Sequence, residues 1–149
     1  MTTRIAYAVA APAAQQALFG LERYVRQCGL DHELLQLVKL RASYMNGCAY
    51  CVDMHTKDAR AAGATEQRLY AVPVWHETPF YSPRERAALA WTEAVTELPH
   101  GGVPDDLFAS TREHFSDAEL VNLTMAVIAI NAWNRMAVTF RSEVGSYNG

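Results

Sequence analysis

Helix signals run through almost the whole sequence, and no segment has the alternation of apolar and polar residues that indicates a strand. Pro12 stands where a helix can begin. An apolar stripe follows it at steps of four and three residues, formed by Ala14, Leu18, Leu21, Val25 and Cys28. This spacing keeps the side chains on one face of a helix. The chain is therefore predicted to be all-α.

Cap and turn residues divide the chain into six or seven predicted helices joined by short loops. Asp31, Thr65, Ser82 and Ser116 each stand where a side-chain oxygen can accept a free backbone N–H of a helix. The helices are expected at about 12–28, 31–45, 48–62, 65–72, 83–98, from 104 onward, and 116–140. Since neither a linker nor a low-complexity segment interrupts the pattern, residues 1–149 are expected to form a single helical domain.

Composition narrows the class of protein. Half of the residues are hydrophobic and the formal net charge is −3, without a block of Lys and Arg. This argues against nucleic acid and membrane surfaces as partners. The Ala-rich N-terminus lacks the Leu, Val and Ile of a signal peptide, and the apolar run VNLTMAVIAINAW is too short to span a bilayer. Three cysteines do not suit a secreted disulfide framework, so a cytoplasmic protein is expected.

The segment NGCAYCVDMH, residues 46–55, holds two cysteines and a histidine. Its Asn-Gly pair signals a turn before a helix. In a helix, steps of three and four residues place Cys48, Cys51 and His55 on one face. The free N–H groups of the first turn favour a thiolate on Cys48, whereas His55 can take the proton of Cys51 or stabilise its thiolate.

Three interpretations of this motif are open on the residues alone. The cysteines could be small buried hydrophobes beside a hydrogen-bonded core histidine. A zinc site lacks an evident fourth ligand, and covalent haem attachment needs a histidine where Val52 stands. The pattern best fits a redox dithiol, in which a sulfenic acid on one cysteine is captured by the other as a disulfide. No metal and no cofactor is therefore expected.

In these residues the chain resembles the carboxymuconolactone decarboxylase superfamily, specifically its alkylhydroperoxidase D-like branch. The resemblance rests on KLRASYMNGCAYCVDMHTKDAR, on FYSPRERAALAWTEAVTELP and on ELVNLTMAVIAINAWNRMAV. It implies an all-α fold around a helical hairpin, in a homo-oligomer that is a trimer or hexamer. It also implies a peroxidase without an organic or metal cofactor, which consumes a hydroperoxide and is reduced by a thiol or dithiol.

The resemblance further implies roles for individual residues. Cys51 attacks the peroxide and Cys48 resolves the product. His55 works with a glutamate twelve residues before the first cysteine, a position that Gln36 occupies here. A glutamine can orient His55 or a water through its amide, but it cannot relay a proton by titrating.

Two further residues bear on this relay. Glu33 lies one turn before Gln36 and is a candidate substitute for the missing carboxylate. Tyr50 stands where the archetypal peroxidase has a second histidine, and a phenol is a poor base at neutral pH. The sequence therefore predicts slower peroxide turnover than the family pattern, or a different substrate or partner.

Residues outside the motif carry weaker signals. Asn134 and Arg135 lie on the most apolar predicted helix, need polar partners, and are expected to brace the cysteine helix or fill a subunit interface. Cys28 is expected to be structural. Four aromatic residues are expected to anchor the core or an interface, or to line an approach to the thiols: Trp75, Phe80, Tyr81 and Trp91.

The predicted function is that of a thiol-dependent peroxidase or disulfide oxidoreductase in antioxidant defence. A decarboxylase or ring-opening lyase acting on a small lactone is a second hypothesis, since such a reaction would use His55 as a base. A redox-sensing module without enzymatic activity is a third.

Overall fold

Helices form the secondary structure of this computed structural model, which describes residues 2–98 and 100–149. The elements in chain order are α1 (Tyr7–Ala10), α2 (Pro12–Gln27), α3 (His32–Met45), α4 (Ala49–Ala61), α5 (Glu66–Ala71), the 3-10 helix η1 (Val72–Glu77), α6 (Pro83–Glu97), α7 (Asp105–Arg112) and α8 (Asp117–Phe140). The prediction of an all-α domain is confirmed.

The predicted caps mark the helix starts. The Asp31 carboxylate accepts the backbone N–H of Leu34 at 3.1 Å and begins α3. Ser82 and Ser116 form capping boxes at the starts of α6 and α8. Two elements escaped prediction. The four-residue α1 has no side-chain cap, and η1 carries the chain helically through Pro73, because proline fits the first turn of a helix.

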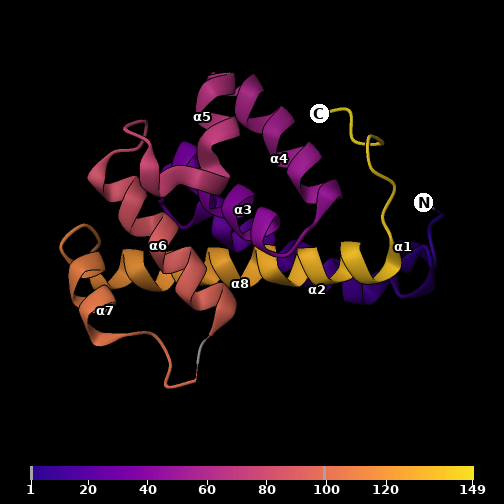
Figure 1. The fold of residues 1–149 in the computed structure, drawn as a ribbon. Helices are drawn as coiled ribbons and strands as arrows, with labels where there is room; N and C mark the ends of the chain where they lie inside the picture. Colours follow the sequence, from indigo (N-terminus) through magenta and orange to yellow (C-terminus); the bar gives the residue numbers. More distant parts are fainter. Residues whose placement is uncertain (1, 99) are drawn as a thin grey trace.

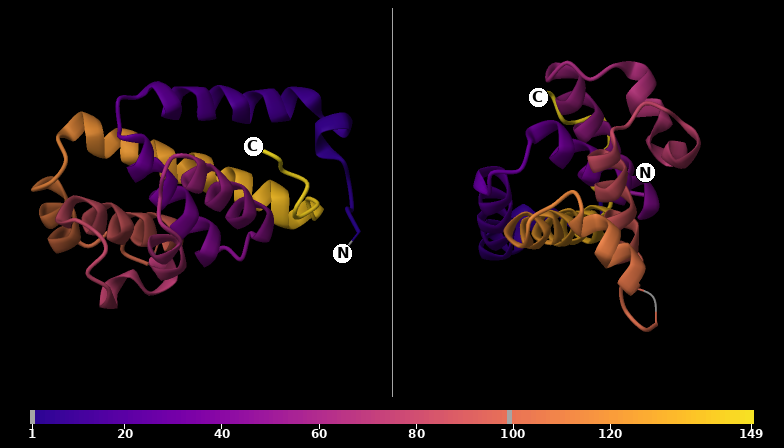
Figure 2. Two further views of the ribbon diagram at one scale, coloured as in Figure 1. Left: turned by 90° about the horizontal axis from the view of Figure 1, so that it is seen from above. Right: turned by 90° about the vertical axis from the view of Figure 1, so that its left-hand side faces the viewer.

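The helices pack around α3 and α8. The long helix α8 runs along the length of the molecule (Figure 1), and α2 lies beside it (Figure 2). Helix α3 is central, with α4, α6 and α8 packed against it. This position explains why it is buried on nearly all sides, as its apolar sequence predicted.

Buried apolar side chains form three clusters. The largest joins α2, α3, α6 and α8, and a second joins α3, α4, α5, η1 and α6. The third is small and contains both motif cysteines with Ala42, Ile130 and Ala137. The thiols therefore lie where α3, α4 and α8 meet.

The aromatic residues do not line an approach to the thiols. Trp75 and Tyr81 belong to the second cluster and Trp91 to the largest. Their polar atoms are satisfied there. For example, the Trp75 indole N–H donates to Glu93 at 2.6 Å. Trp75, Tyr81 and Trp91 therefore anchor the core, which was one of the predicted roles. Phe80 is 37% exposed.

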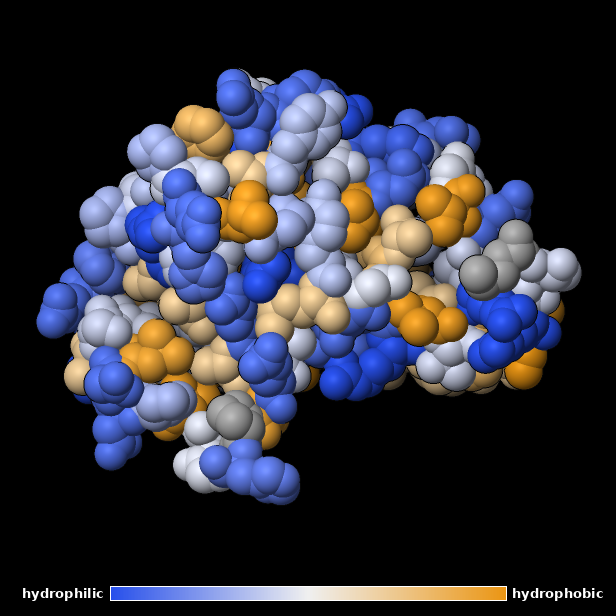
Figure 3. Space-filling view, in the orientation of Figure 1, coloured by the Kyte–Doolittle hydropathy of each residue, from blue (hydrophilic) through white to orange (hydrophobic). Residues whose placement is uncertain are grey.

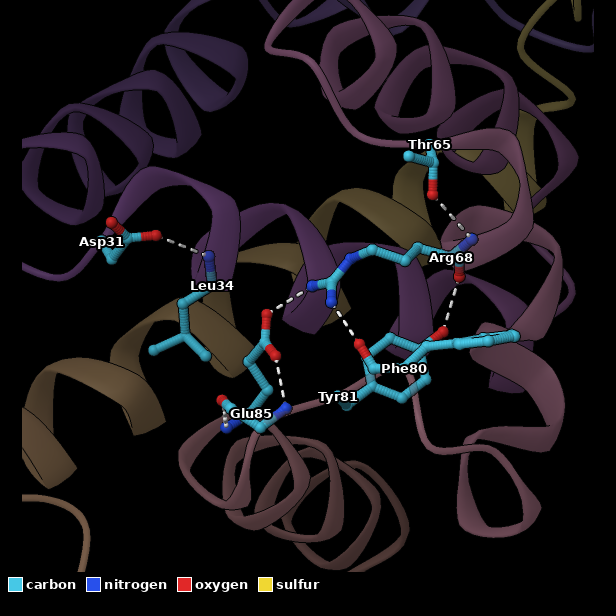
Figure 4. Close-up of polar contacts among 8 residues, drawn as sticks. Asp31, Leu34, Thr65, Arg68, Phe80, Tyr81 and Glu85 are labelled. Carbon is cyan, nitrogen blue, oxygen red and sulfur yellow. Dashed lines mark hydrogen bonds and ion pairs between the residues drawn. The ribbon is translucent and has the colours of Figure 1, made fainter.

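Arg68 fastens the short helices to α6 (Figure 4). Its guanidinium contacts the Glu85 carboxylate and the carbonyl of Phe80. The Tyr81 hydroxyl donates back to the carbonyl of Arg68 at 2.5 Å. These contacts fix the path of the chain from α5 through η1 to α6.

The surface carries scattered apolar residues. On the face seen in Figure 3, hydrophobic residues appear as separate patches divided by polar ones. None of the helices in the described part of the chain has the length and apolar character needed to cross a membrane.

The turn between α3 and α4 is fastened to α8 by one amide. Asn46, the C-cap of α3, donates from Nδ2 to Oδ1 of Asn131 at 3.0 Å and to Oδ1 of Asn134 at 2.9 Å. Asn134 is 1% exposed. A buried amide oxygen that loses its donor keeps the cost of its desolvation, so this contact holds the cysteine-bearing turn in place.

We expect Asn46→Ala to lower the free energy of unfolding by about 1–3 kcal/mol, because it leaves the Asn134 oxygen buried without this donor. Urea unfolding of the reduced protein measures the change. Tyr24→Phe is the matched control, since it removes an exposed hydrogen bond of 2.7 Å between α2 and Asn122 of α8. A loss in Asn46→Ala no larger than in this control would contradict the assignment.

Candidate active site

Cys48 is the N-cap of α4, rather than a member of its first turn as the sequence suggested. Its sulfur accepts the backbone N–H of Cys51 at 3.3 Å. A cap side chain accepts a hydrogen bond that nothing else in the helix can satisfy, and a negative charge is favoured at that position. The geometry therefore stabilises a thiolate on Cys48.

The two thiols interact directly and titrate as a pair. The hydrogen bond from the thiol of Cys51, aided by the Cys51 backbone N–H and the Asn134 amide, lowers the pKa of Cys48 to about 7 against the opposing effect of burial. The same thiol–thiol hydrogen bond, together with burial, raises the pKa of Cys51. Above about pH 7 the pair therefore holds one proton, with the negative charge favoured on Cys48 and the proton on Cys51.

Two polar side chains adjoin this pair from neighbouring helices. Asn134 of α8 lowers the pKa of both thiols, and Ser43 of α3 lowers the pKa of Cys51. Asn134 also donates to the Ser43 hydroxyl at 3.0 Å. The sequence left three roles open for Asn134, which were to line the site, to brace the cysteine helix or to fill an interface, and its bonds to Asn46 and Ser43 make it a bracing residue.

His55 lies one turn after Cys51 on α4 and is 5% exposed. Its Nδ1 contacts Oε1 of Gln36 at 3.0 Å. This is the contact that an orienting role of Gln36 requires. Burial lowers the pKa of His55 to about 3, and the positive charges of Lys39 and Arg26 lower it further. The imidazole is neutral at physiological pH.

The expected direct contact between His55 and Cys51 is not made. Nε2 of His55 is buried and finds no hydrogen-bond partner within residues 2–98 and 100–149. The ring is instead anchored through Nδ1 on Gln36 of α3, and the sulfur of Cys48 accepts the backbone N–H of Cys51. A buried nitrogen without a partner is the group in this site that is ready to accept a hydrogen bond from a ligand.

Glu33 and Tyr50 occupy peripheral positions. The exposed Glu33 lines a cavity of about 20 Å³ beside Gln36, with room for about one water. Tyr50 is half-buried and packs against the thiol cluster, and burial raises the pKa of its phenol. Neither position gives the residue a contact with His55 in the described part of the chain, so neither replaces the relay carboxylate in this arrangement.

Sequence reasoning missed the charges beside His55. The Lys39 side chain, 5% exposed, is paired with Glu22 of α2. This buried pair joins α2 to α3 and places a positive charge near the imidazole. A lysine within the apolar run of α3 was the available signal, because a buried lysine requires a partner.

The site offers sulfur, imidazole and amide groups but no metal cage. Within the described residues, no group of three or more His, Cys, Asp and Glu side chains is placed to hold a metal ion. Cys28 lies apart from the motif, at the end of α2, where it packs against the largest apolar cluster.

Comparison with known proteins identifies the family. A sequence model of the carboxymuconolactone decarboxylase family matches residues 12–94. The chain belongs to the carboxymuconolactone decarboxylase family. It is 40% identical over 146 residues to the uncharacterized protein YdfG of Bacillus subtilis (strain 168), covering 98% of this chain and 99% of that one.

Solved structures place the chain in the AhpD-like branch of the carboxymuconolactone decarboxylase family. It matches a crystal structure from Agrobacterium tumefaciens, a protein of unknown function described as a candidate antioxidant defence protein AhpD. The TM-score is 0.94 and the identity 51%, over 98% of this chain and all of that one. The debrominase Bmp8, in complex with 2,3,4-tribromopyrrole, shares the fold with a TM-score of 0.80 and 19% identity, over 92% of this chain and 73% of Bmp8.

The charge on Cys48 predicts how alkylation depends on pH. Because the pKa of Cys48 is lowered to about 7, the rate of alkylation should rise as the pH rises through about 7 and then level off. Cys48→Ser should abolish this transition, and Cys28→Ser should leave it unchanged. Rates measured with iodoacetamide on the reduced protein test this, and a transition that survives Cys48→Ser would assign the low pKa to another group.

Proposed function

We propose that this protein reduces hydroperoxides through the Cys48–Cys51 dithiol and is returned to its reduced form by a thiol or dithiol. The observation that supports the proposal most is the position of Cys48 at the start of α4, where its sulfur accepts the backbone N–H of Cys51 at 3.3 Å. This contact favours a thiolate on Cys48, while the raised pKa of Cys51 favours a thiol that keeps its proton. Peroxide cleavage needs both, since the thiolate is the nucleophile and the departing alkoxide needs a proton.

The arrangement favours Cys48 as the attacking sulfur, which reverses the roles that the family resemblance implied. The Cys48 thiolate attacks the terminal peroxide oxygen, an S–O bond forms, and the O–O bond breaks. The alkoxide takes the proton of Cys51 and leaves as an alcohol. The Cys51 thiolate then attacks the sulfur of Cys48, forming the disulfide and releasing hydroxide. Reduction by an external dithiol restores the pair and supplies the proton that neutralises the hydroxide.

His55 contributes as a neutral hydrogen-bond acceptor. Nδ1 donates to Gln36, so Nε2 carries a lone pair and has no protein partner. The O–H of a hydroperoxide can donate to this lone pair, which would hold the peroxide close to the two sulfurs. Both cysteines are 1% exposed and the half-buried Tyr50 packs against their cluster, so side chains around the thiols have to move for a substrate to enter.

Lactone decarboxylation fits this geometry less well. Such a reaction would rely on His55 as a base, and an imidazole whose pKa is lowered to about 3 is a weak one. It would also leave the dithiol without a role. A lyase would tolerate Cys48→Ser and Cys51→Ser, whereas dithiol-dependent peroxide reduction would not. A redox-sensing module would form the disulfide without turning over.

We expect one equivalent of an organic hydroperoxide to convert Cys48 and Cys51 into an intramolecular disulfide and to leave Cys28 free. Cys28 caps α2 and packs in a different cluster from the two thiols. Mass mapping of alkylated peptides before and after the dose measures this, and a main product that contains Cys28 would contradict it. Continued peroxide consumption with excess dithiol separates an enzyme from a sensor.

Single cysteine variants decide which sulfur attacks. Cys51→Ser should still consume about one equivalent of peroxide and hold a sulfenic acid on Cys48, whereas Cys48→Ser should react more slowly by a factor of ten or more, since the remaining thiol has a raised pKa. A dimedone probe followed by peptide mapping reads out the sulfenic acid. Fast formation of sulfenic acid on Cys51 in Cys48→Ser would restore the order that the family resemblance implied.

Gln36→Glu should raise the rate of peroxide reduction by roughly two- to tenfold. A carboxylate at this position accepts the Nδ1 proton of His55 more strongly and makes Nε2 a better acceptor. The rate of disulfide formation under single turnover is the measurement, with Glu33→Gln as the control for a charge change beside the same cavity. Equal rates in Gln36→Glu and the wild type would show that position 36 is not coupled to the chemistry.

A further inference from the structure

A hydrogen-bonded chain of three side chains leads from the surface to the site. His32, the first residue of α3, is exposed. Its Nε2 lies 3.4 Å from Nε2 of Gln36, one turn later on the same helix. Oε1 of Gln36 in turn lies 3.0 Å from Nδ1 of the buried His55. One amide thus bridges an exposed imidazole and a buried one.

The donor and acceptor roles in this chain fix where each proton lies. An amide oxygen only accepts, so Nδ1 of His55 must carry a proton and donate it. Since the imidazole is neutral, Nε2 of His55 is then bare, in agreement with its lack of a partner. An amide nitrogen only donates, so Nε2 of His32 must accept and be bare as well. The observed arrangement therefore requires His32 to be neutral.

Protonation of His32 reverses these roles. Both nitrogens of an imidazolium donate, so the amide nitrogen of Gln36 would face another donor. The contact is restored when the amide turns over and presents Oε1 to His32. Its nitrogen then donates to Nδ1 of His55, which must become an acceptor. The proton of His55 consequently moves to Nε2, and the buried nitrogen that has no protein partner changes from acceptor to donor.

We propose that His32 is a positioning residue that acts through the Gln36 amide to decide which nitrogen of His55 carries the proton. Neutral His32 leaves Nε2 of His55 as an acceptor, and charged His32 makes it a donor. One proton enters from solvent at His32, and the number of protons on His55 does not change. The consequence for peroxide reduction rests on the proposed function, whereas the coupling between the two imidazoles does not.

The charged groups around this chain belong to several helices. Lys39 of α3 and Arg26 of α2 act on His55, and Glu22 of α2 is paired with Lys39. The remaining neighbours are Asp31 and Glu33 of α3, Asp58 of α4, Arg68 of α5 and its partner Glu85 of α6. Carboxylates, amines and guanidines ordinarily keep their charge between about pH 5 and 8, whereas histidine does not. Among the three hydrogen-bonded side chains, His32 is therefore the one whose charge a pH change in this range can alter.

Nitrogen-15 NMR of the reduced, histidine-labelled protein tests the coupling directly. The shifts of the two ring nitrogens distinguish a bare nitrogen from a protonated one. While His32 is neutral, His55 should show a protonated Nδ1 and a bare Nε2. When the His32 ring signals report an imidazolium, the two signals of His55 should have exchanged character over the same pH interval.

Variants at the exposed end separate this coupling from other causes. His32→Gln and His32→Phe should abolish the pH-dependent change at His55. His100→Ala, which removes an exposed histidine elsewhere, should retain it. A tautomer of His55 that stays constant across the titration of His32 would overturn the proposal. So would an exchange that persists with the same midpoint in both variants at position 32.

Kinetics provides a second and separable measurement. If the dithiol reduces hydroperoxides, two protonations oppose the reaction in acid, one at Cys48 and one at His32. At the acid end, each decrease of one pH unit should then lower the single-turnover rate about a hundredfold in the wild type. In His32→Gln the same decrease should lower the rate about tenfold. Equal slopes would overturn the role of His32 in the reaction. If no hydroperoxide reacts at all, the proposed function fails while the NMR result still decides the coupling.

Discussion

The side-chain amide of Asn46 holds the site together, because it joins the turn between α3 and α4 to α8. This turn delivers Cys48 to the start of α4, and the same contact orients Asn134, which reaches both sulfurs and Ser43. The thiol pair is therefore built at a junction of three helices rather than on one helix alone. A local sequence motif supplies the sulfurs, and distant residues supply their surroundings.

The surroundings of the two sulfurs and the histidine favour a different protonation state for each group. The backbone N–H of Cys51 favours charge on Cys48, while the thiol–thiol contact leaves the proton on Cys51. Burial and two nearby cations keep His55 neutral. The family pattern pairs a histidine with a carboxylate, but Gln36 provides an amide that can offer either an oxygen or a nitrogen. At this position a carboxylate could change its charge, whereas the Gln36 amide can change only its orientation.

Much of the fold could be predicted from the sequence because its signals are local. The caps at Asp31, Ser82 and Ser116 fix helix starts within a few residues of themselves, and apolar periodicity indicates what lies between. The spacing of Cys48, Cys51 and His55 likewise predicted that they lie close along one segment, but it did not predict that Cys48 is the N-cap of α4 or that Nε2 of His55 has no protein partner. Contacts between distant positions could not be predicted this way. The bonds of Asn134 to Ser43 and of Lys39 to Glu22 depend on which helices become neighbours.

The N-cap of α4 exists only while Cys48 is reduced. A thiolate is a good acceptor for the N–H of Cys51, but a disulfide sulfur is uncharged and accepts weakly. In the proposed cycle, oxidation would therefore weaken the cap as it joins the two cysteines. The first turn of α4 would lose stabilisation on the scale of a helix cap, about 1 kcal/mol, and would fray more readily. The chemical state of two buried sulfurs would thus set the stability of the backbone beside them.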